Sequence, residues 1–187
     1  MVGTTSILDR QLALVRGLTP HILIVTNDRS RVQLAASKPG RGGADHVAIV
    51  IDRIADAGAL GGMYTALLEA PTDQVLIIGC DMPFLEAPFL TYLMERGRDA
   101  AAVVPRDEHG RHPLCASYAR GIADHLLLRI KGGDLRVGEA LRDIDVVEIG
   151  PDELAPFNRD GRLLMNVNTP DDYARARQAS TDTDSVP

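Results

Sequence analysis

The sequence predicts an α/β domain built around a mainly parallel sheet. Short apolar segments rich in β-branched residues alternate along the chain with segments of helical periodicity. Several apolar segments, such as "QVLIIG" from Gln74, are continuous rather than alternating, as expected for strands that are covered on both faces. Three strand candidates end at a polar residue, Asn27, Asp52 or Asp81. Ligands of such sheets bind beyond the carboxyl ends of the strands, which makes these three residues site candidates.

The expected strands share a high content of Val, Ile, Leu and Ala and are bounded by polar or turn-forming residues. They are 21–26, 46–51, 74–79, 101–105, 114–119 and 145–149. The expected helices are 6–17, 30–36, 60–70, 86–96, 122–128, 135–141 and 170–178. Between the fourth and fifth strands, "RDEHGRHP" reads as an exposed connection.

The first helix shows how these assignments are made. Ser6 and Asp9 have the spacing of a capping box at its start. The apolar residues of the segment recur at helical spacing, so we expect them to form the buried face. They are Ile7, Leu8, Leu12 and Val15.

Composition narrows the class of protein. A length of 187 residues favours a single domain, here about 1–178, and 179–187 lacks apolar periodicity and is expected to be a disordered tail. The net charge is −6 and Lys and Arg do not cluster, which argues against a nucleic-acid partner. Cys80 and Cys115 are too few for a disulfide framework or a four-cysteine zinc site, which suits a reducing cytoplasm. No apolar run is long enough to cross a membrane, and the first residues do not form a signal peptide pattern.

Asp81, in "LIIGCDMPFL", is the leading chemical candidate. A carboxylate at a strand end can hold Mg²⁺, which takes few protein ligands and shares the rest with phosphates and water. The structural alternative is that Asp81 caps a turn whose geometry is set by Pro83.

Two glycine-rich segments come before Asp81. Gly58, Gly61 and Gly62 surround the start of the helix in "GALGGMYTAL", where glycine lets a ligand approach backbone N–H groups. A loop that binds nothing is the alternative. The run "KPGRGG", 38–43, lacks the Gly-Lys-Ser/Thr of a phosphate-binding loop and is interpreted as an exposed turn.

Asn166 and Asn168, in "NVNTPDDYARA", lie two residues apart and would face one side of a strand. Thr169 as N-cap, Pro170 at the first helical position and Asp172 three residues after the cap are explained by helix initiation. Capping leaves the two asparagines unexplained, which makes them site candidates. His112, before Pro113, is a candidate polar group or simply the start of a strand.

Taken together, these segments resemble the molybdenum cofactor guanylyltransferase family over nearly the whole chain. "GCDMPFL" resembles the family's Cys-Asp-x-Pro signature, and "GALGGMYTAL" its Gly-Pro-Leu-x-Gly segment with Ala59 in place of proline. "HPLCASY" and "NVNTPDDYARA" match its C-terminal signatures. The resemblance implies a Rossmann-like three-layer nucleotidyltransferase fold. It also implies a cytoplasmic enzyme that transfers GMP from GTP to molybdopterin with Mg²⁺ and releases pyrophosphate.

The resemblance also assigns roles to residues. Asp81 would ligate Mg²⁺ and contact GTP, while Asn27, Asp52 and Gly58 would help to bind GTP. On the pterin side would lie Asn166 and Asn168. The implied partners are GTP, molybdopterin or molybdenum cofactor, and molybdoenzymes or other proteins of cofactor biosynthesis, with no nucleic acid or membrane.

The first residues depart from the family pattern. The family opens with a strand and a loop of the form Leu-Ala-Gly-Gly-x-Ser-x-Arg-Met-Gly followed by a lysine, whereas "MVGTTSILDRQL" resembles the segment after that loop. We therefore expect a chain that is N-terminally truncated relative to the family, has an upstream start, and binds GTP phosphates weakly.

Two alternatives remain open. One is a related enzyme, such as molybdenum cofactor cytidylyltransferase. The other is a non-catalytic module that binds pterin or a partner protein.

Overall fold

The computed structural model describes residues 6–28, 30, 46–169, 172 and 174. All six predicted strands are present, and one short strand was not predicted. The strands are β1 (His21–Thr26), β2 (His46–Ile51), β3 (Gln74–Ile78), β4 (Ala102–Asp107), β5 (Gly110–Arg111), β6 (Cys115–Ala119) and β7 (Val146–Ile149). β5 lies within the segment expected to be an exposed connection and pairs with the end of β4.

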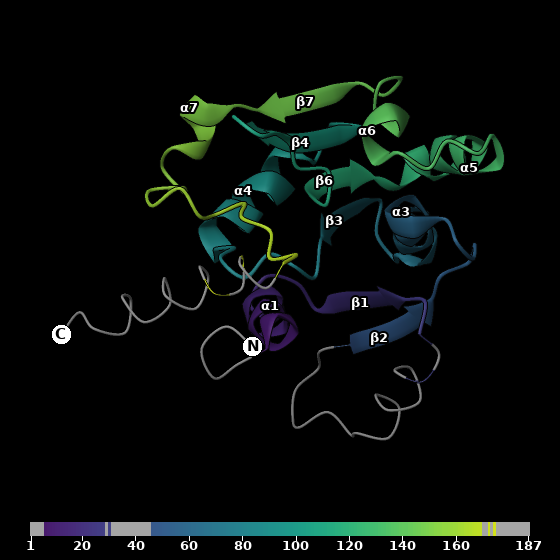
Figure 1. Cartoon of the computed structure of the whole chain (residues 1–187), viewed down its shortest axis with the longest axis horizontal. Helices are drawn as coiled ribbons and strands as arrows, with labels where there is room; N and C mark the ends of the chain where they lie inside the picture. The colour runs from purple at the N-terminus through teal and green to yellow at the C-terminus, as the bar shows by residue number, and fades with distance from the viewer. Residues whose placement is uncertain (1–5, 29, 31–45, 170–171, 173, 175–187) are drawn as a thin grey trace.

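The strands form two sheets. β1 and β2 pair in parallel, and β3, β6, β4, β5 and β7 make up the larger sheet (Figure 1). β6 is antiparallel to both β3 and β4, and β7 is parallel to β4. β3, β4 and β7 therefore share one direction, and β6 runs against them. The prediction of a mainly parallel sheet is confirmed, with β6 and the short β5 reversed. Among the described strands, no ladder joins β1 to β3.

The helices occupy the predicted places where the structure describes them. They are α1 (Ile7–Arg16), α3 (Gly58–Glu69), α4 (Ala87–Arg96), the 3₁₀ turn η1 (Arg120–Ile122), α5 (Ala123–Lys131), α6 (Val137–Ala140) and α7 (Pro151–Leu154). The four-residue α7 was not predicted. Most of the expected helices 30–36 and 170–178, together with the turn 38–43 and the tail 179–187, lie outside the described residues.

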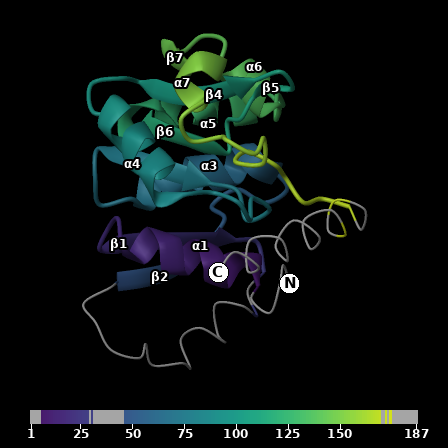
Figure 2. The same ribbon diagram turned by 90° about the vertical axis from the view of Figure 1, so that its left-hand side faces the viewer.

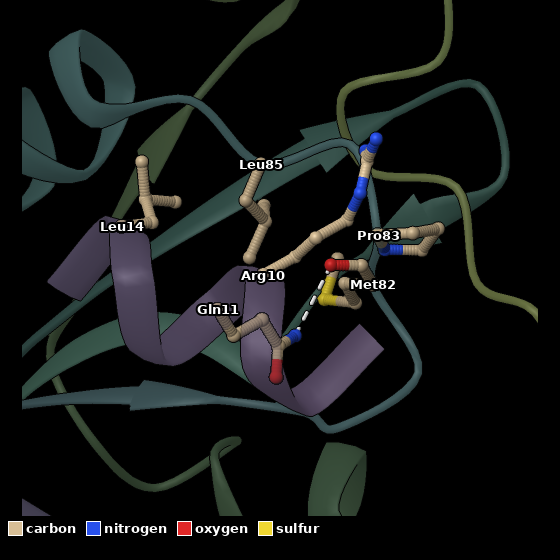
Figure 3. A pocket seen from close by; sticks show the side chains of 6 residues that line it. All are labelled: Arg10, Gln11, Leu14, Met82, Pro83 and Leu85. Carbon is tan, nitrogen blue, oxygen red and sulfur yellow. Dashed lines mark hydrogen bonds between the residues drawn. The ribbon is translucent and has the colours of Figure 1, made fainter. Parts of the chain in front are cut away.

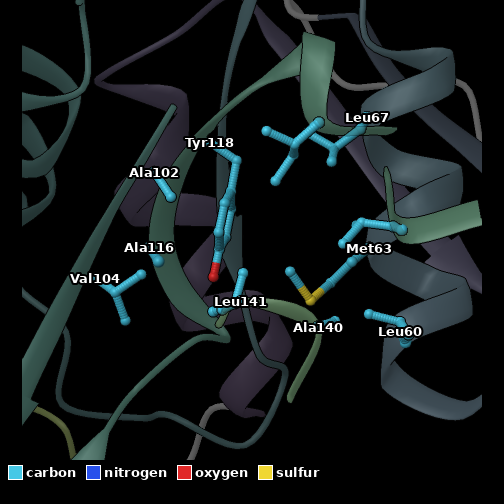
Figure 4. Close-up of a cluster of buried hydrophobic side chains, with 11 residues drawn as sticks. Leu60, Met63, Leu67, Ala102, Val104, Ala116, Tyr118, Ala140 and Leu141 are labelled. Carbon is cyan, nitrogen blue, oxygen red and sulfur yellow. The ribbon is translucent and has the colours of Figure 1, made fainter. Parts of the chain in front are cut away.

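Alternate residues of each central strand enter different hydrophobic cores. On one face, Ala102 and Val104 of β4 pack with Tyr118 of β6 beneath α3, α5 and α6 (Figure 4). On the other face, Val103 of β4 and Cys115 of β6 pack with α4, α7 and the apolar side of α1. Helices on both faces of a sheet give the three-layer architecture, and both-sided burial explains the continuous apolar sequence of these strands.

The start of α1 agrees with the prediction, and its buried face agrees in part, since Val15 packs against the core but Leu8 does not. Ser6 Oγ accepts a hydrogen bond from the Asp9 N–H at 3.1 Å and donates one to Asp9 Oδ2. Leu8, expected on the buried face, is 38% exposed, whereas Gln11 is only 8% exposed. Gln11 lies on the inner face because that face meets the turn after β3 as well as the apolar core. Figure 2 shows α1 below the larger sheet, together with β1 and β2.

An ion-pair cluster holds the β4–β5 hairpin against β7. Arg111 Nε donates to Glu148 Oε1 at 2.7 Å, and Arg106 Nη1 donates to Glu148 Oε2 at 3.1 Å. The hydrogen bonds from Arg111 and Arg106 lower the pKa of the Glu148 carboxyl from its ordinary value. Among the described helices, none combines the length and the apolar composition that crossing a bilayer requires.

Candidate functional site

Asp81 lies in the turn that follows β3, at the edge where β4 and β7 also end. The Gly79 N–H donates to the carbonyl oxygen of Leu114 at 2.6 Å, which fixes the start of this turn against the segment before β6. The Asp81 carboxylate lies against Gly79. A Cβ added to Gly79 would be only 2.7 Å from Asp81 Oδ1. Glycine is therefore the residue that leaves room for the carboxylate.

A segment distant in sequence is joined to this turn. The Val167 N–H donates to the Asp81 carbonyl oxygen at 2.8 Å, so the two predicted asparagines lie on either side of a residue bonded to Asp81. Asn166 and Asn168 are both exposed. The expectation that they lie on a strand is wrong: 165–168 has no regular structure, because its backbone bonds go to separate turns rather than to a strand ladder.

The capping contacts expected of Thr169 and Asp172 are confirmed, while Pro170 lies outside the described residues. Asp172 N donates to Thr169 Oγ1 at 3.1 Å, and Thr169 N donates to Asp172 Oδ2 at 2.9 Å. The N–H of Asn168 also donates to Asp172 Oδ2, at 3.2 Å. This reciprocal capping box fixes the backbone on the far side of the asparagine pair.

Asn27 and Asp52 form a second group beside the two-stranded sheet. Thr26 and Ile51 are paired in the parallel register, and the Asp52 N–H donates to the Thr26 carbonyl oxygen at 3.0 Å. Asn27 is exposed and follows Thr26 directly. The strand ends thus bring two of the predicted residues together, as expected for parallel neighbours.

One oxygen of the Asp52 carboxyl is buried, although the residue as a whole is half-buried. Its Oδ1 atom is shielded from solvent and has no hydrogen-bond partner among the described residues. Burial raises the pKa of Asp52 from its ordinary value, and a hydrogen bond with the Thr65 side chain opposes this shift. A Cβ on Gly62 would lie 3.8 Å from Asp52 Oδ1, so the carboxyl faces the first turns of α3.

Gly58 opens α3 in a conformation that favours glycine. Its φ is +56°, in the left-handed region, and a Cβ there would meet nothing within 4 Å. The preceding N-cap residue, Ala57, offers no side-chain hydrogen bond to the helix. The glycine therefore serves the tight entry into the helix and leaves open space beside it.

The six predicted site residues thus fall into two groups. Asp81 lies with Asn166 and Asn168, while Asp52 lies with Asn27 and faces the helix that Gly58 opens. Among the described residues, no side-chain hydrogen bond or ion pair links the two groups. Two residues that hold the Asp81 turn, Gln11 and Leu114, were not predicted as site residues; Gln11 has a sequence signal, because it interrupts the apolar stripe of α1.

Asp81 fits a metal that takes few protein ligands. In the described part of the chain, no three His, Cys, Asp or Glu side chains form a metal cage. A single carboxylate at a sheet edge is compatible with Mg²⁺, which is commonly bound by one or two carboxylates plus substrate phosphates. It does not suit a structural zinc ion, which needs four protein ligands.

Comparisons with known proteins identify the family of the chain. Residues 1–144 match the family described as "MobA-like NTP transferase domain". A "Probable molybdenum cofactor guanylyltransferase" of Natronomonas pharaonis is 29% identical over 171 residues, which cover 91% of this chain and 80% of that protein. A protein of the same name from Aquifex aeolicus is 24% identical over 170 residues, covering 90% and 76%.

The fold has a similar solved counterpart. The crystal structure of molybdopterin-guanine dinucleotide biosynthesis protein A from Archaeoglobus fulgidus superposes with a TM-score of 0.81. It is 23% identical, and the match covers 97% of this chain and 89% of that one. This likeness supports the three-layer nucleotidyltransferase fold. The match over 1–144 carries the assignment further: the chain belongs to the family of MobA-like NTP transferase domains.

Proposed function

We propose that this protein transfers GMP from GTP to molybdopterin or molybdenum cofactor and releases pyrophosphate. The observation that carries the proposal is the turn at Asp81, where one fixed carboxylate and the segment of Asn166 and Asn168 are joined by the Val167 hydrogen bond of 2.8 Å. A carboxylate able to hold a metal, bonded through its backbone to a segment that carries two amide side chains, suits a reaction between two phosphate-bearing substrates. We take 1–178 as a single catalytic domain that acts in the cytoplasm.

The reaction needs positioning more than it needs acid–base chemistry. A terminal phosphate on the pterin attacks the α-phosphate of GTP, a new P–O bond forms, and the bond to the β-phosphate breaks to release pyrophosphate. The attacking phosphate monoester is largely ionised at neutral pH, since its second pKa is about 6. The protein therefore has to bring two polyanions together and hold them in line.

The residues would divide this work between the two groups. Asp81 would hold Mg²⁺, which when bound neutralises charge on the phosphates. Asn166 and Asn168 would hydrogen-bond the pterin side. Asn27, Asp52 and the open space beside Gly58 would bind the nucleotide.

Asp52 supports a preference for guanine. Its buried oxygen lacks a partner among the described residues, and a buried acceptor of this kind is costly unless a donor reaches it. Guanine carries both a ring N–H and an amino group on one edge, whereas cytosine and adenine each carry only an amino group there. A carboxylate can accept from both guanine donors at once, which favours GTP over CTP and ATP.

The test compares pyrophosphate release from GTP, CTP and ATP with Mg²⁺ and molybdopterin, using the wild type and Asp81→Asn. We expect turnover with GTP, and a loss of at least ~100-fold in the variant because the metal ligand is weakened. Asp145→Asn is the matched control, because that exposed aspartate precedes β7 at the opposite edge of the sheet.

Each arm has a result that opposes the proposal. Preferential turnover of CTP would move the assignment to the cytidylyl branch. Pterin binding without turnover of any nucleotide would favour a binding module, and full activity of Asp81→Asn would remove the metal role. Pull-down of molybdoenzymes or other cofactor-biosynthesis proteins would identify the partners that receive the product.

A further inference from the structure

The side chain of Gln11 reaches the turn that carries Asp81. Its Nε2 donates to the Met82 carbonyl oxygen at 3.1 Å (Figure 3). The same Nε2 donates to the Gly79 carbonyl oxygen at 2.7 Å. These two carbonyls lie on either side of Cys80 and Asp81 in the chain. One buried amide on α1 therefore ties both ends of the turn together.

The chemistry of the contact explains why glutamine is suited to it. A primary amide carries two N–H donors on one nitrogen, so it can serve two carbonyl groups at once. Aliphatic side chains offer no donor, and a buried carbonyl that loses its donor is destabilised. The side chain is only 8% exposed, so water does not readily take its place.

The other contacts of the turn are made by the backbone. Gly79 N–H donates to Leu114 at 2.6 Å and Val167 N–H donates to the Asp81 carbonyl at 2.8 Å. Gln11 adds a side-chain contact to this turn. It does so from α1, which lies far earlier in the sequence than the turn. The orientation of the Asp81 carboxylate depends on the backbone of the residues that Gln11 holds.

We propose that Gln11 is a positioning residue of the nucleotidyl-transfer site, which fixes the Asp81 carboxylate in the orientation that binds a divalent cation. The proposal rests on the proposed function for its kinetic consequences but not for its metal-binding consequence. Gln11 touches neither substrate nor metal in this scheme and acts only through the turn.

The central variant is Gln11→Met, which keeps an unbranched side chain of similar length and removes both donors. We expect kcat to fall ~10- to 100-fold and the Mg²⁺ concentration for half-maximal activity to rise ~10-fold, as for other residues that orient a metal ligand. The KM for GTP should change little, because the base is held by the Asp52 group. Mn²⁺ binding, followed by the loss of the free-ion electron paramagnetic resonance signal, should weaken ~10-fold.

Two further variants separate positioning from simple stability. Leu14→Ala removes an apolar contact of the same helix and leaves the carbonyls of Gly79 and Met82 bonded. It should lower the melting temperature without moving Mn²⁺ affinity. Gln11→Asn keeps the amide on a side chain one methylene shorter, so its Mn²⁺ affinity should lie between those of the wild type and Gln11→Met. If Gln11→Met does not fold, Gln11→Asn takes its place in the test.

The outcomes keep the two proposals apart. Absence of nucleotidyl transfer by the wild type would overturn the proposed function, while the Mn²⁺ measurements would still report on Gln11. Unchanged Mn²⁺ affinity in a folded Gln11→Met or Gln11→Asn protein would overturn the positioning role. An equal loss of Mn²⁺ affinity in Leu14→Ala would do the same, because it would reduce the effect to loosening of α1.

Discussion

Gly79→Ala tests how closely the Asp81 carboxylate is fitted to its surroundings. The added Cβ would lie 2.7 Å from Asp81 Oδ1, 3.5 Å from Leu114 Cβ and 3.6 Å from the Leu114 carbonyl oxygen. The two contacts with Leu114 are ordinary van der Waals contacts. Only the carboxylate has to move, by about 0.7 Å, to reach a normal separation of about 3.4 Å.

The substitution should therefore separate activity from stability. The carboxylate ends a rotatable side chain, and alanine restricts the unfolded chain by about 0.4–1 kcal/mol, so the free energy of unfolding should change by less than about 1 kcal/mol. A displacement approaching 1 Å at a group that positions the reacting atoms can cost ~100-fold in rate. We expect kcat to fall ~10- to 100-fold.

The assay is pyrophosphate release with GTP, paired with urea unfolding of the same preparations. Gly138→Ala in α6 is the control, because its Cβ would meet nothing within 4 Å and the glycine lies within a helix. It should be neutral in activity and neutral or stabilising by up to about 1 kcal/mol. Wild-type activity in a correctly folded Gly79→Ala protein would refute the reasoning.

Three further substitutions probe the fold. Gly97→Ala would make the new Cβ clash with Ser117 Oγ and should lower the free energy of unfolding by about 1–3 kcal/mol. Adding Ser117→Gly should recover part of this loss. Strictly additive effects of the two substitutions would contradict the clash. Tyr118→Phe removes the hydroxyl that donates to the Pro113 carbonyl oxygen at 2.7 Å, and its urea midpoint should fall by an amount equivalent to about 1 kcal/mol. Glu148→Gln should flatten the pH dependence of stability on the acid side. In the folded wild type, two arginine hydrogen bonds hold the pKa of the Glu148 carboxyl below the ordinary 4.5. The wild type therefore loses their contribution as pH falls from about 4.5 through that lower value. Identical pH profiles of the two proteins would contradict the last expectation.

The sequence predicts burial of the strands better than it predicts their direction. Continuous apolar runs such as those of β4 and β6 report that both faces are covered, and the two cores confirm this. Apolar composition carries no information on direction, so β6 was not recognised as reversed. A signal was present in its connection: 108–114 is too short for the crossover that parallel neighbours need.

The ends of the predicted strands located individual site residues. They did not predict which of these residues come together. Asn27, Asp52 and Asp81 lie where strands end, because the periodicity of the sequence marks those ends. The bond from Val167 to Asp81 joins residues far apart in the chain and leaves no local pattern. Gln11 was not among the residues expected on the buried face of α1, because helical periodicity counts only apolar residues, whereas its amide donors are used in the interior.

Among the described strands no ladder joins the two sheets, so we expect β1 and β2 to open locally before the larger sheet does. β1 and β2 form a ladder only with each other among the described strands, so their backbone hydrogen bonds can break without disturbing β3, β4 or β6. A nucleotide held by Asp52 at one sheet and by Asp81 at the other would act as a cross-link, and part of its binding energy would be used to suppress this opening. Amide protons of β1 and β2 should then exchange with solvent faster than those of β4 and β6, and slow most when the nucleotide is bound. Departure of product would follow the local opening of a two-stranded unit while the larger core stays folded.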